Sequence, residues 1–569
     1  MEEPVSNALR AEGRPPASVV FGLLVVVKRM QGLLNALAYG LVGTALANGG
    51  TFNTPLQHVI VIVQENRTPD NLFGADTALK SAGAHLVTAG SCHGTSITLA
   101  AWQLDACFNP SHTHPAWLTM YDNGAMDGAC DVSMSAESCN EKSLHACPPG
   151  ASQEYCPNYT YVSNSTGLLN PYFQLAEQYG FANYMFQTNQ GPSFPAHQFL
   201  FSGTSAPTAY PTQFFDWFAA ENLGGAATNN GCIGSANSVI MEVDPATGDE
   251  SAGYRPPYAP PANTAGFPCY EHNTLADVLE SAGVSWRYYT GAEGSLWTAP
   301  DAIHHICLES NGKCTGPDWP PTGTKVSQNP GQVLTDLGVN GTGTNNCQLQ
   351  QVSWVIPDGH WSDHPGTVGH DGGPSWVAAI VNAVGGYDNA GVKLPVQCNY
   401  WADTAILITW DDWGGFYDDV NPIATIGGGS SGYPGGGGNG SKYVYGFRVP
   451  LLVVSPYAKA GYISGPANNP TCPNFYCHDF GSILKFSEYV FGQQGKALGP
   501  IGSSQWPYAD SFVQDLGNPP NNYSLYDFFD FHGQPRAFTP IKGAKYATKC
   551  FLKPKACFPH FLPAAPDSD

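Results

Sequence analysis

Two pairs of neighbouring side chains in this sequence carry the oxygen atoms that metal-dependent chemistry needs. Glu65 and Asn66 directly follow one apolar run, and Asp411 and Asp412 directly follow another. Carboxylate and amide oxygens suit Ca²⁺ or Mg²⁺, and they also suit Mn²⁺ or Zn²⁺ if a histidine joins them. Each pair alone could be an ordinary acidic strand end, but two such pairs favour a site in which a cation neutralises the adjacent carboxylates. We therefore predict that these four residues bind one divalent metal ion.

A serine that such an ion could activate lies between the two pairs. The segment 191–195, Gly-Pro-Ser-Phe-Pro, predicts a tight turn that presents Ser193. A serine hydroxyl is a poor nucleophile unless a base or a metal lowers its pKa, and a bound ion would also aim the oxygen at phosphorus. The segment lacks the G-x-S-x-G pattern of the α/β-hydrolase nucleophile elbow. On this motif alone, an ordinary loop serine is the favoured interpretation of Ser193.

Three local histidine clusters supply further chemistry. They lie around His112, His305 and His364. Phosphoryl transfer needs donors for the non-bridging oxygens and an acid for the leaving group. Histidine can do both near neutral or acidic pH, although any one of these residues could instead be a hydrogen-bonded structural histidine.

The elements that must position these residues predict an α/β fold. Continuous apolar runs indicate buried strands, and segments of helical character alternate with them. This alternation is typical of a parallel or mixed sheet, in which ligands collect at the carboxyl ends of the strands. The predicted strands are 58–64, 284–289, 352–356, 404–410 and 451–455, and the predicted helices are 171–179, 275–282, 375–384 and 480–491.

Length and charge limit the classes of function. The 569 residues are enough for a large core in one or two domains. The formal charge of −22 argues against a nucleic-acid partner, which would favour a basic face. An anionic substrate remains compatible with this charge, because a bound cation reverses the local field. The glycine-rich segment 427–440 does not match a phosphate-binding loop and predicts a flexible surface loop.

The cysteine content bears on the compartment. Sixteen cysteines indicate several disulfides in an exported protein, and the alternative is buried, reduced thiols in a cytosolic enzyme. Their spacing leaves the pairing open. The cysteines that lie closest in the sequence are Cys472 with Cys477, Cys550 with Cys557, and the cluster of Cys130, Cys139, Cys147 and Cys156.

The N-terminal segment also indicates export. Lys28 and Arg29 precede the apolar stretch 32–47, which ends in an Ala-Leu-Ala cleavage pattern. We predict that residues 1–47 are a signal peptide or a signal-anchor, and that the protein is exported to a periplasmic or extracellular location.

Several segments together resemble a known family. The sequence E-N-R-T-P-D-N-L-F-G at 65–74 resembles the E-N-R-S-F-D-x-x-F-G signature of the bacterial and plant phosphoesterase family, and T-W-D-D-W-G-G-F-Y-D at 409–418 resembles its T-Y-D-E-x-G-G-F-Y-D block. That family includes non-specific phospholipases C and secreted acid phosphatases. Further segments that resemble family blocks, in the same order, are 112–128, 191–204, 297–306, 362–366, 448–456 and 482–486.

The resemblance implies a fold and a set of roles. The implied fold is alkaline-phosphatase-like, with a central, mostly parallel sheet flanked by helices and with long Cys- and Gly-rich loop insertions, and residues 48–569 would form a single phosphoesterase domain. Pro69 stands where the family usually has phenylalanine, and Asp412 stands where many members have glutamate. The implied metal ligands are Glu65, Asn66, Asp411, Asp412 and the nucleophile Ser193, and the implied phosphoryl-binding or acid groups are His112, His305 and His364.

The function that these implications predict is an exported, metal-dependent phosphoesterase. It would hydrolyse phosphate esters through a phosphoserine intermediate, with a phospholipid headgroup as substrate and transient contact with membrane lipid. The metal would be Ca²⁺, Mg²⁺, Mn²⁺ or Zn²⁺, and no protein partner is implied. One alternative is an acid phosphatase that acts on soluble phosphomonoesters. A less favoured alternative is a secreted binding protein without catalytic activity.

Overall fold

The structure is a computed structural model, and it describes most of the chain after residue 53. The predicted signal segment 1–47 and the glycine-rich segment 427–440 lie outside the described residues. The described residues are 54–137, 146–207, 217–223, 230–235, 237–244, 247–253, 255, 264–339, 347–422, 444–465, 478–492, 497–498 and 524–558.

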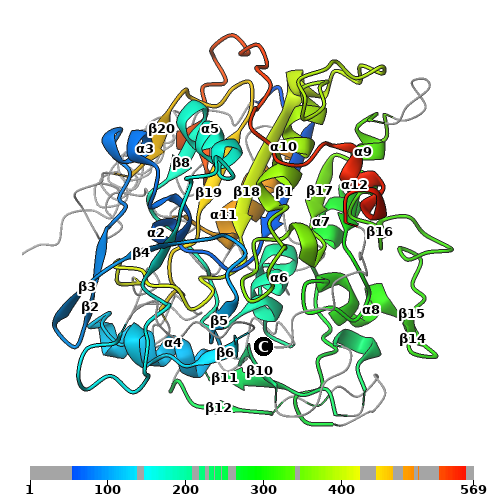
Figure 1. Cartoon of the computed structure of the whole chain (residues 1–569). Coiled ribbons are helices and arrows are strands. Elements are labelled where there is room, and N and C mark those ends of the chain that lie inside the picture. The colour runs from blue at the N-terminus through cyan, green and yellow to red at the C-terminus, as the bar shows by residue number, and fades with distance from the viewer. Residues whose placement is uncertain are drawn as a thin grey trace, which may run out of the picture. The chain divides into compact units, whose positions relative to one another are not determined.

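An eight-stranded, mostly parallel sheet forms the centre of the fold (Figure 1). The five strands from β16 to β18 are parallel to their neighbours, β19 is antiparallel to both β18 and β8, and β20 is parallel to β8. In spatial order the strands are β16 Val326–Ser327, β13 Trp286–Tyr289, β17 Val352–Val355, β1 His58–Gln64, β18 Thr404–Trp410, β19 Leu451–Val454, β8 Gly180–Ala182 and β20 Tyr462–Ser464.

The two central strands have the bounds that their apolar runs predict. Every residue of β18 is buried, and every residue of β1 after His58 is buried. A strand in the middle of a sheet that is covered on both faces has no solvent-facing side, which explains a continuous apolar run in place of alternation. The predicted strand at 284–289 begins two residues later, at Trp286.

Helices flank this sheet in two groups. The helix α5 packs against α10, and α6 packs against α7 and α11 (Figure 1). A capping box at Thr274 and Asp277 begins α7, as its sequence predicts. These observations confirm the predicted fold class. The longer helices are α4 His114–Tyr121, α5 Asn170–Gln178, α6 Ser193–Ser202, α7 Leu275–Ser281, α10 Gly373–Val384 and α11 Phe480–Phe491.

Disulfides tie down the long loops around the sheet. No cysteine in the described part of the chain is free, which confirms the prediction of disulfides there. Cys472 and Cys477 lie outside the described residues. The described pairs are Cys92–Cys130, Cys147–Cys156, Cys232–Cys269, Cys307–Cys314, Cys347–Cys398 and Cys550–Cys557.

Within the described ranges, no helix combines the length and the apolar character that crossing a membrane requires.

Candidate active site

The two acidic strand ends meet because β1 and β18 are neighbours. The parallel register pairs Gln64 with Trp410, the last residues of the two strands. Glu65 and Asp411, which follow them, therefore lie at the same edge of the sheet. There, Asn66 N–H donates a hydrogen bond of 2.9 Å to Asp411 Oδ1. Glu65, Asn66 and Asp411 are all fully buried. The structure therefore brings both predicted pairs of ligands together.

A tight backbone approach holds the turn after β1 in place. Asn66 has a φ of 63°, in the left-handed region that asparagine tolerates better than most residues. Gly414, from the turn after β18, comes so close that a Cβ atom there would lie 2.4 Å from the Asn66 carbonyl oxygen. A glycine is required at this position, because any side chain would push the two strand ends apart. The Gly414 N–H also donates to Asp412 Oδ1 at 2.6 Å.

His112 contacts the predicted ligand Asn66. Its Nδ1 lies 2.8 Å from the Pro110 carbonyl oxygen, and its Nε2 lies 2.8 Å from Asn66 Nδ2. A carbonyl oxygen can only accept, so Nδ1 carries a proton, and Nε2 of the neutral ring accepts from the Asn66 amide. Asn66 Oδ1 is buried without a hydrogen-bond partner among the described residues. This arrangement leaves the oxygen of the amide to face a cation.

The helix α6 presents Ser193 to the same cluster. Ser193 is the first residue of this helix, so the structure places it at a helix N-terminus and not in the tight turn that the sequence predicts. Its Oγ donates to Glu65 Oε2 at 3.4 Å. Proline at 195 is compatible with the helix, because backbone N–H groups in the first turn donate no intrahelical hydrogen bond and the missing N–H of proline costs none.

His197 is a site residue that the sequence reasoning missed. Its Nε2 lies 3.2 Å from Glu65 Oε1 and 3.8 Å from Asp411 Oδ2. Burial lowers the pKa of His197 to about 4, against the opposing effect of the Asp411 carboxylate, so the ring is neutral at physiological pH. The sequence contains one signal for it, since His197 lies four residues after Ser193 and thus on the same face of a helix that begins there.

The donor set of this cluster fits a divalent cation. Candidate ligand atoms of Glu65, His197 and Asp411 all lie within 4.8 Å of one another, and all three residues are buried. Asp411 Oδ2 has no hydrogen-bond partner in the described structure. Buried carboxylates that repel each other are costly without a compensating positive charge, and a bound cation supplies it.

The ring of His364 lies near the ring of His112. The two ring centroids are 6.0 Å apart, and the Trp297 ring is 6.2 Å from His364. His364 Nδ1 donates to the Pro365 carbonyl oxygen at 2.7 Å, which directs any proton transfer to Nε2.

The residue before His364 anchors this loop in the core. The Asp363 carboxylate accepts hydrogen bonds from Tyr172 Oη at 2.8 Å and from Trp410 Nε1 at 2.9 Å. Burial raises the pKa of Asp363 to about 6, although the nearby Arg67 guanidinium opposes this shift. The loop is therefore fixed to the end of β18, next to the ligands.

His305 has a different environment. Its Nδ1 lies 2.5 Å from Glu271 Oε1, and its Nε2 lies 3.0 Å from Asp277 Oδ1. Burial would lower the pKa of His305, but the two carboxylates outweigh this effect and raise the pKa to about 10. Both nitrogens of a cationic ring are thus held by carboxylates, and contact of His305 with a phosphoryl group stays a prediction.

Comparison with known proteins gives the family. The Phosphoesterase family matches residues 56–494, which is most of the chain and includes every residue of the cluster. The chain belongs to the Phosphoesterase family. This match confirms the family that the sequence motifs predict.

Relatives of this phosphoesterase are bacterial phospholipases C. The chain is 29% identical to the non-hemolytic phospholipase C of Burkholderia pseudomallei, over 41% of the chain and 33% of that enzyme. It is 24% identical to phospholipase C A of Mycobacterium tuberculosis, over 71% of the chain and 69% of the relative. It is 22% identical to the hemolytic phospholipase C of Pseudomonas aeruginosa, over 78% of the chain and 54% of the relative. The chain thus matches between one third and about two thirds of the length of these relatives.

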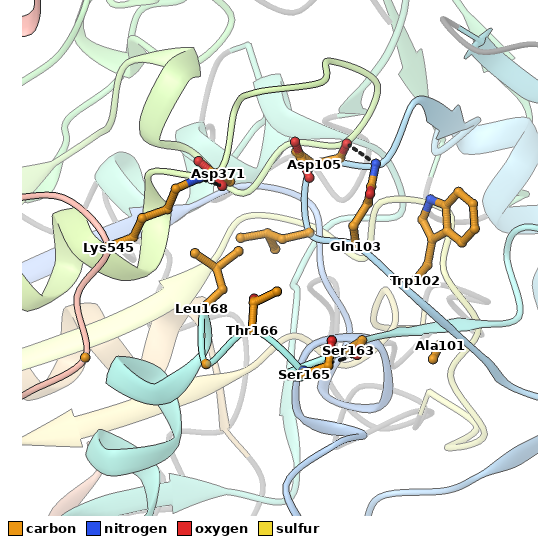
Figure 2. Close-up of a pocket in the computed structure, with 13 residues that line it drawn as sticks. Ala101, Trp102, Gln103, Asp105, Ser163, Ser165, Thr166, Leu168, Asp371 and Lys545 are labelled. Atoms are coloured by element: carbon orange, nitrogen blue, oxygen red, sulfur yellow. Dashed lines mark hydrogen bonds and ion pairs between the residues drawn. The ribbon is translucent and has the colours of Figure 1, made fainter. Parts of the chain in front are cut away.

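A cavity of about 700 Å³ lies beside the segments 101–105 and 163–168 (Figure 2). Asp371 and Lys545 form an ion pair at its wall, and Leu104 also lines it. The Leu104 carbonyl accepts from Arg67 Nη2 at 2.7 Å. None of the predicted site residues lines this cavity.

Proposed function

We propose that this protein is an exported phospholipase C-like phosphoesterase that hydrolyses phosphate esters through a phosphoserine intermediate. The observation that carries the proposal is the position of Ser193 Oγ, 3.4 Å from Glu65 Oε2 in a buried cluster of carboxylate, amide and imidazole groups. The residues that would hold a divalent cation are Glu65, Asn66, Asp411, Asp412 and Ser193. When bound, the cation would withdraw charge from the serine oxygen and from the phosphoryl oxygens.

Ser193 is the nucleophile in this proposal. Its Oγ forms a bond to phosphorus while the bond from phosphorus to the leaving-group oxygen breaks, which gives phosphoserine and an alcohol. The Oγ proton passes to solvent water as Oγ attacks. A water oxygen then bonds to phosphorus as the Oγ–phosphorus bond breaks, which releases the phosphate product, and Oγ takes a proton back from solvent. The Glu65 carboxylate accepts the hydroxyl hydrogen bond and therefore orients Oγ before attack.

His364 is the acid that we assign to the leaving group. His112 Nε2 accepts from Asn66 and so has no proton to give while that hydrogen bond persists. His364 directs Nδ1–H to a carbonyl oxygen, which leaves Nε2 as the atom that delivers a proton to the leaving oxygen and takes one from water in the second step.

The names of the relatives support a diester substrate, because all three are phospholipases C. Purified protein with added Zn²⁺, Mn²⁺, Mg²⁺ or Ca²⁺ should hydrolyse p-nitrophenyl phosphorylcholine faster than p-nitrophenyl phosphate. Hydrolysis of only the monoester would favour the acid phosphatase, and hydrolysis of neither would favour a binding protein.

Replacement of the nucleophile tests the chemistry. Ser193→Ala should lower kcat by more than about 10³-fold while the fold is kept. Ser202→Ala, at the other end of α6, is the matched control and should retain turnover. Near-wild-type turnover by Ser193→Ala would refute the phosphoserine intermediate.

The disulfides support the proposed export. Six disulfides among the described residues are typical of proteins in an oxidising compartment. Fractionation of the producing cells, with detection of the mature N-terminus by mass spectrometry, tests both export and cleavage after Ala47.

A further inference from the structure

His197 reaches the metal-ligand cluster from the same helix as Ser193. One helical turn separates the two residues on α6, and both contact the Glu65 carboxylate, Ser193 through Oε2 and His197 through Oε1. His197 is only 1% exposed. Its ring therefore belongs to the interior of the site and not to its entrance.

The distances around His197 Nε2 suit a ligand of the same ion. Neighbouring ligands of a cation with bonds of about 2.1 Å lie roughly 3.0 to 3.4 Å apart in octahedral or tetrahedral geometry. The separation from Glu65 Oε1 is 3.2 Å, and the separation from Asp411 Oδ2 is 3.8 Å. A small shift of one side chain would bring all three atoms into a single coordination shell.

His197 can carry its ring proton on Nδ1. His197 Nδ1 is buried and has no hydrogen-bond partner within the described ranges. Without a cation, the Glu65 carboxylate can only accept, so His197 Nε2 carries the proton in that contact. Nothing at Nδ1 opposes a move of this proton to Nδ1, whereas the Pro110 carbonyl fixes the proton of His112 on its Nδ1. The tautomer with its proton on Nδ1 leaves a lone pair on Nε2, directed at the two carboxylates.

We propose that His197 Nε2 is a nitrogen ligand of the metal ion, and that the site therefore selects a transition-metal ion of the Zn²⁺ or Mn²⁺ type over Mg²⁺ and Ca²⁺. Mg²⁺ and Ca²⁺ take oxygen ligands, whereas imidazole suits Zn²⁺ and related ions. This inference rests on the metal site of the proposed function, and it names the class of ion that the site takes.

Metal binding in the absence of substrate tests the inference. Mn²⁺-loaded protein should show ¹⁴N modulation from a bound imidazole in pulsed electron paramagnetic resonance, and His197→Gln should abolish it. The same substitution should lower Zn²⁺ affinity, measured by competition with a chromophoric chelator, by more than about 100-fold, which is the upper range for the loss of an outer hydrogen-bond partner. Affinity for Mg²⁺ should change less, so that the preference for Zn²⁺ narrows.

His112→Gln is the matched control, because it removes an imidazole that contacts a ligand but not the ion. With Mn²⁺ in excess, so that a weakened site is still filled, this variant should keep the nitrogen modulation, and it can still contradict the proposal if His197→Gln does not fold. Loss of the modulation in His112→Gln, its absence from wild-type protein, or its persistence in folded His197→Gln would each overturn the proposal. A protein that binds Zn²⁺ through His197 but hydrolyses no ester would refute the proposed function and leave this inference standing.

Discussion

Asn66 donates its side-chain N–H to His112 Nε2 at 2.8 Å, and this hydrogen bond decides which atom of Asn66 faces the metal-ligand cluster. His112 Nδ1 must donate to the Pro110 carbonyl, so Nε2 can only accept. The amide nitrogen therefore turns toward His112, and the amide oxygen turns away from it. In the proposed metal site, His112 would therefore position Asn66 as a ligand.

Loss of this hydrogen bond should weaken metal binding. We expect His112→Ala to lower affinity for the divalent ion by about 10- to 100-fold, because Asn66 can then rotate its amide. Isothermal titration calorimetry measures this change. His364→Ala is the control, and we expect it to lower turnover while affinity for the ion stays within a few-fold. Unchanged metal affinity in His112→Ala would favour the phosphoryl-binding role that the family resemblance implies.

The charge of the cluster predicts opposite effects on the metal-free and metal-bound protein. Asp411→Asn removes one of several buried negative charges and keeps an oxygen that can accept from the Asn66 N–H. We expect the metal-free variant to be more stable than the metal-free wild type by about 1 kcal/mol in the free energy of unfolding, and therefore to unfold at a higher temperature. In saturating metal the order should reverse, because the wild type gains more binding energy. Calorimetric melting with and without a chelator gives the stability of the wild type and of the variant in both states. A variant that is less stable than the wild type in both states would contradict the expectation.

Asp363 predicts a pH dependence of stability. Burial raises its pKa to about 6 in the folded protein, against an ordinary value of 3.8. Since the folded-state pKa is the higher one, the stabilisation that the neutral carboxyl provides is present below pH 4 and is lost as pH rises through 6. Asp363→Asn should therefore change the free energy of unfolding more favourably at pH 7 than at pH 4, by about 2 kcal/mol. Urea unfolding at both pH values measures the difference, and the exposed Asp249→Asn is the matched control.

Arg448 predicts a large loss of stability. Its buried guanidinium pairs with Asp70 at 2.9 Å, with Asp418 at 2.7 Å and with Asp419 at 3.1 Å. Arg448→Met leaves buried carboxylates without their cation, which should cost about 3 to 5 kcal/mol in the free energy of unfolding. Lys325→Met removes a partly exposed lysine that pairs with the partly exposed Glu280 and with the largely buried Asp318, and it should cost about 1 kcal/mol. Equal losses in the two variants, measured by chemical unfolding, would contradict the structural role of Arg448.

Local pattern alone determined the elements that carry the site. The strands at 58–64 and 404–410 have the bounds that their apolar runs predict, because a buried parallel strand needs apolar side chains on both faces. The helix 480–491 also has its predicted bounds, and an aspartate caps it. The sequence also predicts where these two strands end, because a change from apolar to charged residues marks the end of a buried segment. The acidic residues after each strand stand out at this change.

Only the tertiary structure decided which residues meet. Asn66 and Asp411 are 345 positions apart, and their contact depends on the pairing of β1 with β18, which no local pattern encodes. Because α6 begins at Ser193, His197 lies one helical turn later and contacts the cluster. His305 instead forms ion pairs with Glu271 and Asp277. Strand order and side-chain direction result from the packing of the whole core, whereas the length and burial of each element follow from its own residues.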